Sequence, residues 1–160
     1  MVDYSHSMSS RTDQESMQLL LSADPSQAAI EAYIGKCELH QFRADNQLTG
    51  VLALLPTRPE TMEIVNIAVA QDYQQQGLGT HMVRFAQQRA AQLGMKRLEV
   101  GTGSTSFAAL ALYQKCGLRM SWIDRDYFVD RYPEPLTENG IPLRDMVRLS
   151  CPIPCATLNE

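Results

Sequence analysis

A short glycine-containing segment in the middle of the chain has the composition of an anion-binding turn. Gln74 to Gly79 has the sequence QQQGLG; it follows an apolar, strand-like run from Glu63 to Val69 and opens a helical pattern that continues to Leu93. Backbone N–H groups in the first turn of a helix have no partner within the helix and carry partial positive charge. Glycine lets such a backbone close on a phosphate group. The segment therefore predicts a pyrophosphate-binding loop.

The residues around this turn exclude two common phosphate-binding loops. A P-loop needs Lys followed by Ser or Thr after its second glycine, whereas Thr80 and His81 follow Gly79. The dinucleotide-binding fingerprint needs three glycines near the start of a βαβ unit, whereas this turn has two and lies in the middle of the chain. A glycine pair also occurs at ordinary helix starts, so the turn alone leaves a purely structural role open.

Two motifs together resemble the Gcn5-related N-acetyltransferase (GNAT) superfamily. Its coenzyme A loop has the pattern Gln/Arg-x-x-Gly-x-Gly/Ala, which Gln74, Gly77 and Gly79 match position for position. A later family motif has the pattern Asn-x-x-Ala-x-x-Leu-Tyr-x-x-x-Gly-Phe. Here the matching residues are Ala109, Leu112, Tyr113 and Gly117, with Ser106 and Leu118 in place of the usual Asn and Phe. The resemblance extends over roughly residues 17 to 150.

The resemblance implies a single α/β domain with a mixed, mostly antiparallel sheet, flanked by helices and splayed at a coenzyme A cleft. The apolar patterns predict strands at 18–21, 37–42, 48–55, 63–69, 97–100, 120–123 and 144–149, and helices at 25–34, 78–93 and 107–116. Residues 1–16 are polar and are predicted as a dispensable mobile tail before an N-acetyltransferase domain at 17–160.

The spacing between the first two predicted strands bears on the acceptor site. Family members commonly place two helices here, and these roof the acceptor cleft. Only one helix fits between Leu21 and Lys36, with Asp24 as its cap and Pro25 at its first position. We therefore expect an acceptor cleft that is open, or that is completed by a second subunit.

The resemblance implies acetyl-CoA as the cosubstrate and direct transfer of its acetyl group to a primary amine. The strand segment Ile67-Ala68-Val69 would bind the pantetheine arm through its backbone. A backbone N–H there would polarise the thioester carbonyl. The remaining predicted coenzyme contacts are Gln74, Gln75, Gln76, Gly77, Leu78, Gly79, Thr80, Ser106, Ala109 and Tyr113.

Two side chains are predicted to move protons. Tyr113 occupies the position of the family's general acid, although a helical tyrosine is also a common core residue. Glu63 occupies the strand position of the catalytic glutamate in histone-type members and is predicted as the general base, directly or through a water. Glu63 could equally face solvent, and Asn66 on the same strand could instead orient a water. His40 and His81 are weaker candidates.

Acidic residues after the strand that follows Tyr113 are the predicted acceptor contacts. Asp124, Asp126 and the nearby Asp130 could attract a cationic amine. The alternative is a solvated loop, and the charge alone does not distinguish a polyamine, an aminoglycoside, a lysine side chain or an N-terminal amine.

Composition limits the remaining classes of partner. The chain has 160 residues, 44% of them hydrophobic, and a net charge of −4, which disfavours a nucleic-acid partner. No apolar run is close to the length of about 20 residues that spans a bilayer.

Four cysteines (Cys37, Cys116, Cys151 and Cys155) lack a metal-binding pattern and predict cytoplasmic thiols, with neither a metal nor a disulfide. The resemblance also allows a homodimer.

Two other functions remain open from the sequence. The departures at Gln74 and Ser106 allow a non-catalytic coenzyme A sensor or regulatory module on the same fold. If the glycine turn is only a helix start, the protein is an interaction domain. Release of thiol from acetyl-CoA in the presence of amines, and a rise in melting temperature with coenzyme A, distinguish these functions from the enzyme.

Overall fold

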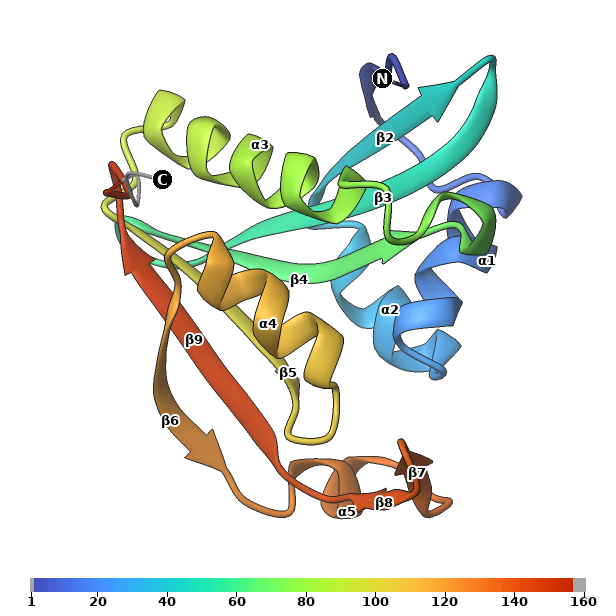
Figure 1. The fold of residues 1–160 in the computed structure, drawn as a ribbon, viewed down its shortest axis with the longest axis vertical. Coiled ribbons are helices and arrows are strands. Elements are labelled where there is room, and N and C mark those ends of the chain that lie inside the picture. The colour runs from blue at the N-terminus through green and yellow to red at the C-terminus, as the bar shows by residue number, and fades with distance from the viewer. Residues whose placement is uncertain (1, 157–160) are drawn as a thin grey trace.

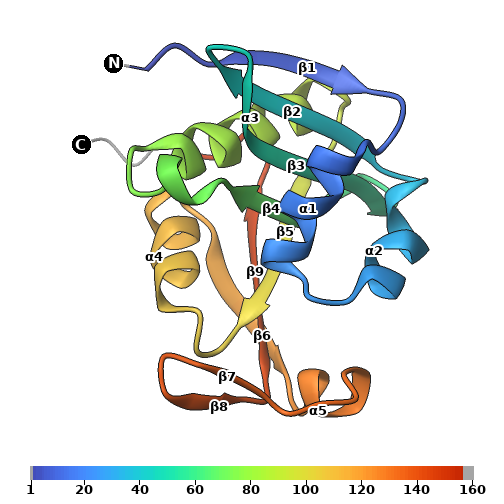
Figure 2. The same cartoon turned by 90° about the vertical axis from the view of Figure 1, so that its right-hand side faces the viewer.

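The computed structural model describes residues 2–156, which form a large sheet with helices on both faces and a separate small hairpin (Figures 1 and 2). The strands are β1 (Ser5–Ser9), β2 (Glu38–Ala44), β3 (Gln47–Arg58), β4 (Thr61–Val69), β5 (Arg97–Gly103), β6 (Arg119–Asp124), β7 (Leu136–Glu138), β8 (Ile141–Leu143) and β9 (Met146–Pro152). The helices are α1 (Gln14–Ala23), α2 (Gln27–Ile34), α3 (Leu78–Gln92), α4 (Phe107–Lys115) and α5 (Tyr127–Arg131), with a 3-10 turn at Gln71–Tyr73.

Seven strands form a mixed sheet in the order β1-β2-β3-β4-β5-β9-β6, and β7 and β8 form a separate hairpin. Every neighbouring pair in the large sheet is antiparallel except β4 and β5. The predicted mixed, mostly antiparallel sheet is therefore confirmed. No helix within residues 2–156 is long and apolar enough to cross a membrane.

Two apolar clusters cover the two faces of the sheet. One contains α3 and α4 residues such as Met82 and Tyr113 packed on Leu52 and Leu98. The other joins α1 and α2 to the opposite face, through residues that include Leu20 and Ile30. Alternate residues of β3 point into different clusters, as the two-residue period of a strand requires.

The helix after the glycine turn confirms the prediction for residues 78–93. Its buried stripe has helical spacing, and it consists of Leu78, Met82, Val83, Ala86 and Ala90. Gly50 on β3 gives this stripe room, because an added Cβ there would lie 2.8 Å from Sδ of Met82. The close approach of helix and sheet fixes where the glycine turn projects.

The N-terminal region differs from the prediction. Ser5–Ser9 forms β1 and pairs with β2, with His6 opposite Phe42. Residues 18–21, predicted as a strand, lie in α1, where Leu20 is fully buried. A short apolar run fits a buried helix as well as a strand, so its period could not decide between them.

Two helices therefore separate β1 from β2, and the predicted single helix is wrong. Asp24 ends α1 instead of capping the next helix. Ser26 caps α2, and its hydroxyl accepts a hydrogen bond from the N–H of Ala29 at 3.1 Å. Residues of both helices, including Ala23 and Tyr33, border the cleft.

The sheet splays between β4 and β5, as the resemblance implied. The two strands pair only from Thr61 to Ile64 on β4 and from Arg97 to Val100 on β5. The main chain of residues 65–69 continues without β5 as a neighbour. A bulge also interrupts the pairing of β4 with β3 between the partners of Ala53 and Leu54, so Val65 is an extra residue in the strand.

The segment between β6 and β9 folds more than its turn-rich sequence indicated. It forms α5 and the β7–β8 hairpin, in a stretch for which no helix or strand was predicted. Figure 1 shows these elements beside the end of β5 and the start of β9. They supply one wall of the cleft described below.

Candidate active site

The glycine turn presents main-chain donors. Gln75 and Gly77 have φ values of 58° and 86°, in the left-handed region. Nothing lies within 4 Å of a Cβ added at Gly77. In residues 2–156, none of the backbone hydrogen bonds that join turns and elements is donated by residues 75–80, whereas His81 N–H donates to Gly77 carbonyl at 3.0 Å. These N–H groups are therefore free to bind an anion.

Glutamine side chains hold the turn in this shape. Gln74 Nε2 donates to the carbonyl of Val69 at 3.1 Å, and Gln76 Nε2 donates to the carbonyl of Asp72 at 2.8 Å. Leu78 is buried in the core, so only its backbone faces the turn. Gly79 allows close packing of α3 on α4, because an added Cβ would lie 3.1 Å from Cδ2 of Leu112.

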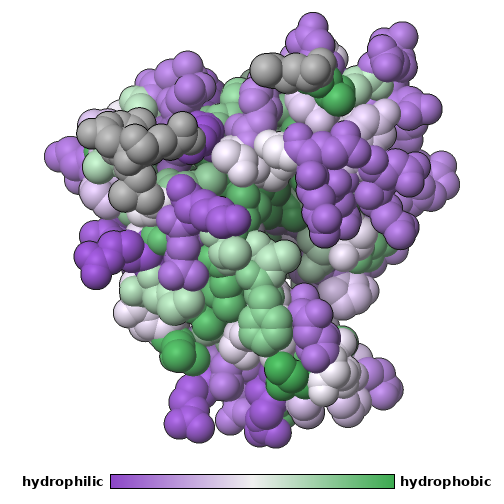
Figure 3. Space-filling model, viewed as in Figure 1, coloured by the Kyte–Doolittle hydropathy of each residue, from purple (hydrophilic) through white to green (hydrophobic). Residues whose placement is uncertain are grey.

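Two adjoining cavities occupy the splay of the sheet. The Tyr113 cavity, of about 700 Å³, is lined by Asn66, Ile67, Ala109 and Tyr113 among others. The Glu63 cavity, of about 460 Å³, is lined by residues that include Tyr33, Glu63 and Arg148. The two share lining residues from α1, β4, β5 and β7, and together they form the cleft. Figure 3 shows an apolar surface over α4 and a hollow beside it, towards the start of α3.

Tyr113 lies in the wall of its cavity with 4% of its surface exposed. Burial raises the pKa of the phenol well above its usual value, with a smaller contribution from Cys116. The hydroxyl therefore stays protonated at neutral pH, as a proton donor must. Ala109, one turn earlier on α4, lines the same cavity.

Glu63 lies in the other half of the cleft. Its Oε1 is 2.8 Å from Nη1 of Arg148 on β9, and its side chain is 19% exposed. The structure thus brings Ile67, Ala109 and Tyr113 to one cavity and places Glu63 in the adjoining one. Sequence reasoning missed Arg148, since neither its spacing nor its motif context distinguished it.

Asn66 joins the helices to β4. Its Nδ2 donates to the carbonyl of Leu20 at 3.2 Å and to the Tyr33 hydroxyl at 3.0 Å. Burial raises the pKa of Tyr33 to about 12, so this hydroxyl also keeps its proton. The bulge at Val65 explains why Glu63 and Asn66 both face α2, because residues three apart in a regular strand point to opposite faces.

The remaining predicted residues lie in different places. Ala68 packs in the core beneath α1. Ser106 lines both cavities, and its hydroxyl donates to Oε2 of Glu138 on β7 at 2.7 Å. Asp124, Asp126 and Asp130 line neither cavity of the described structure. Asp126 pairs with Arg144 at 2.7 Å. The contact of these acids with the acceptor stays a prediction.

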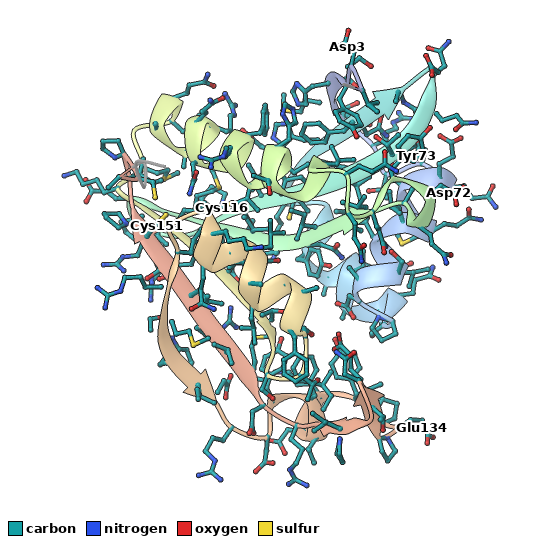
Figure 4. All side chains as sticks on the ribbon, in the orientation of Figure 1. Asp3, Asp72, Tyr73, Cys116, Glu134 and Cys151 are labelled. Atoms are coloured by element: carbon teal, nitrogen blue, oxygen red, sulfur yellow. The ribbon has the colours of Figure 1, made fainter. Side chains whose placement is uncertain are left out.

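The cysteines lie apart from the cleft. All four are free thiols, and none lines either cavity. Figure 4 shows Cys116 and Cys151 near the end of β9, far from Asp72 and Tyr73 beside the glycine turn. Burial raises the pKa of Cys37 to about 11, which disfavours its thiolate form.

Comparisons with known proteins agree on one family. The family profile described as "Acetyltransferase (GNAT) family" matches residues 8–118. A protein of Bacillus subtilis (strain 168), described as uncharacterized N-acetyltransferase YvbK, is 47% identical over 138 residues, which cover 86% of this chain and 89% of that protein.

Solved structures show the same similarity. A Bacillus subtilis acetyltransferase in complex with CoA has 43% identity and a TM-score of 0.91, over 94% of this chain and 99% of the other. A GNAT family acetyltransferase from Elizabethkingia anophelis with acetyl-CoA bound has 37% identity and a TM-score of 0.90, over 94% and 98% of the two chains. The free donors of the glycine turn, the splayed sheet and these relatives lead to one conclusion: this chain belongs to the acetyltransferase (GNAT) family.

Proposed function

We propose that this acetyltransferase moves the acetyl group of acetyl-CoA directly to a primary amine, within a complex that holds both substrates. The observation that carries the proposal is the presence together of three features: the free N–H groups of residues 75–80, the unpaired edge of β4, and the buried phenol of Tyr113. The relatives crystallised with CoA or acetyl-CoA support the choice of cosubstrate.

The chain's backbone would hold the donor. Donors at the start of α3 bind the diphosphate of the coenzyme. The edge of residues 65–69 binds the amides of the pantetheine arm as an added strand would, because β5 has already diverged there. A backbone N–H on this edge stabilises the negative charge that grows on the thioester oxygen during attack.

Tyr113 is the proposed general acid. When the amine displaces coenzyme A, the sulfur leaves as a thiolate and needs a proton. A buried phenol with a raised pKa is protonated before the reaction, so its hydroxyl can donate a hydrogen bond to the sulfur as negative charge develops there.

Glu63 is the proposed general base. An amine in neutral solution is mostly an ammonium ion, which has no lone pair for attack. The contact with Arg148 uses Oε1, so Oε2 of Glu63 remains to accept the proton, directly or through a water. The ion pair fixes the carboxylate on the wall of the cleft.

Direct transfer is supported by the position of the thiols. A covalent acetyl-enzyme would need a nucleophile beside the thioester, and no cysteine of the described chain lines the cleft. Labelled acetate bound covalently to the protein during turnover would contradict this step.

The proposal is tested by following coenzyme A release from acetyl-CoA against a panel of primary amines. We expect one acetylated amine for each thiol released, identified by mass spectrometry. A rise in melting temperature with coenzyme A, but no amine-dependent thiol release, would instead support a non-catalytic coenzyme A binder. If millimolar coenzyme A does not raise the melting temperature, the result would instead support an interaction domain.

A further inference from the structure

Charged side chains are distributed unevenly along the cleft. The charged residues that line the Tyr113 cavity are two acids, Asp24 and Glu138. The Glu63 cavity shares both acids and adds Glu63, Arg131 and Arg148. The half of the cleft that contains Tyr113 is therefore acidic, whereas both arginines line only the half that contains Glu63.

The two shared acids are held at the junction of the cavities. The Tyr132 hydroxyl donates to Oδ1 of Asp24 at 2.8 Å, and the Ser106 hydroxyl donates to Oε2 of Glu138 at 2.7 Å. Each neutral hydroxyl occupies one carboxylate oxygen and leaves the negative charge uncompensated. An ammonium group is therefore favoured at this junction, beside the Tyr113 cavity.

The arginines surround one aromatic ring in the other half. The guanidinium carbon of Arg131 lies 4.0 Å from the centre of the Tyr127 ring, and that of Arg148 lies 6.0 Å from it. Arg148 is paired with Glu63, but Arg131 has no ion pair among residues 2–156. A guanidinium stacked on a ring keeps its N–H edges free, and these edges match a carboxylate in a two-bond contact.

Four aromatic side chains line this half of the cleft. Tyr33, Phe128 and Tyr132 line the Glu63 cavity together with Tyr127. Such walls favour an apolar or aromatic body between the two charged ends of a ligand. The predicted polyamine and aminoglycoside acceptors carry several positive charges, and the positive charge of Arg131 would repel them.

We propose that the acceptor is a small amino acid-like molecule, with a primary amine and a carboxylate on an apolar or aromatic body. The amine points towards Asp24 and Glu138, and the carboxylate binds Arg131. This inference rests on the proposed acetyl transfer and adds the class and orientation of the acceptor.

The test compares matched acceptors on the wild-type enzyme: para-(aminomethyl)benzoate against benzylamine and para-(aminomethyl)benzamide, and phenylalanine against phenethylamine. These pairs differ in charge while the aromatic body and the amine are kept. We expect at least one carboxylate to exceed its neutral partners in kcat/KM by about tenfold, the range of one charge-assisted Arg–carboxylate contact.

Arginine variants then locate the contact. Arg131→Met is expected to bring the ratio of carboxylate to neutral kcat/KM close to one. Arg125→Met is the matched control, because Arg125 is an exposed arginine nearby that does not line the cleft; it should keep the wild-type ratio. Arg131→Lys should retain part of the preference.

The outcomes separate this inference from the function on which it rests. Acetylation of neutral amines as fast as their carboxylate partners, or a preference that survives Arg131→Met, would overturn the inference alone. Absence of transfer to every amine would overturn the proposed function as well.

Discussion

Arg148 reaches Glu63 across an intervening strand, with Nη1 of Arg148 2.8 Å from Oε1 of Glu63. Arg148 lies on β9 opposite Gly101 of β5, and Glu63 lies on β4 beyond it. A Cβ at Gly101 would lie 3.0 Å from Nη1 of Arg148 and 2.6 Å from Sδ of Met146. The missing side chain at Gly101 thus gives the guanidinium its path to the carboxylate.

We therefore expect Gly101→Ala to displace Arg148 and to disturb the cleft. A methyl group forced into this contact should lower kcat/KM about 10- to 100-fold, since small misplacements of reacting groups have effects of this size. Steady-state kinetics with a responsive amine measures the effect. Gly35→Ala is the control, because nothing lies within 4 Å of a Cβ added at Gly35; equal losses in both variants would contradict the role of Gly101.

Glu63→Gln tests the proposed base. The amide keeps the shape of the side chain but cannot take a proton, so we expect kcat to fall by about 10²- to 10⁴-fold at neutral pH. The residual rate should rise with pH until the free acceptor amine itself is deprotonated. A pH–rate series on both proteins tests this, and the idea fails if the variant retains the wild-type rate and profile.

Tyr113→Phe tests the proposed acid. Without the hydroxyl the thiolate leaves unassisted, and kcat should fall about 10- to 1000-fold, the range of general-acid effects. Coenzyme A affinity should change little, because the ring remains in its buried site. Calorimetric titration and turnover measured on the same preparation separate the two effects; an unchanged kcat would remove Tyr113 from the mechanism.

The N-terminal strand creates a pH dependence of stability. His6 Nε2 lies 2.9 Å from His40 Nδ1, and His40 Nε2 lies 3.0 Å from Glu38, which Arg89 also binds. Burial is the largest cause that lowers the pKa of both histidines. Their neutral forms are therefore favoured in the folded state, and the unfolded chain binds more protons below the usual histidine pKa of about 6.5.

Stability should consequently be full above about pH 6.5 and should fall as the pH drops below that value towards the lowered pKa values. Urea unfolding at a series of pH values between neutral and mildly acidic measures the change. His40→Gln should flatten this dependence. An unfolding free energy that is constant over the range, or that rises as the pH falls, would contradict the account.

Some parts of the site followed from local sequence because they depend on local geometry. The glycine turn, the helix after it and the strand before it lie within one continuous segment, and all were predicted. The position of Tyr113 came from a motif of fixed spacing. The structure then showed that its ring lines the cleft, which periodicity alone leaves open.

Other parts depend on contacts between distant segments. The Glu63–Arg148 pair joins residues 85 positions apart, and the spacing of residues does not indicate such a contact. The bulge at Val65 changes the face of the sheet on which the Asn66 side chain lies, so strand alternation alone places this side chain on the wrong face. The Leu19–Leu21 run became a helix because it packs beneath the sheet, a tertiary effect that propensity does not resolve.

The central claim is that the main chain of the glycine turn binds the coenzyme diphosphate, and a crystal structure with bound acetyl-CoA tests it most directly. We predict diphosphate oxygens within about 2.7–3.2 Å of backbone nitrogens among residues 75–80, with the thioester sulfur near the Tyr113 hydroxyl. Clear density for the cofactor with its diphosphate elsewhere, or with these N–H groups bound to other parts of the protein, would contradict the account.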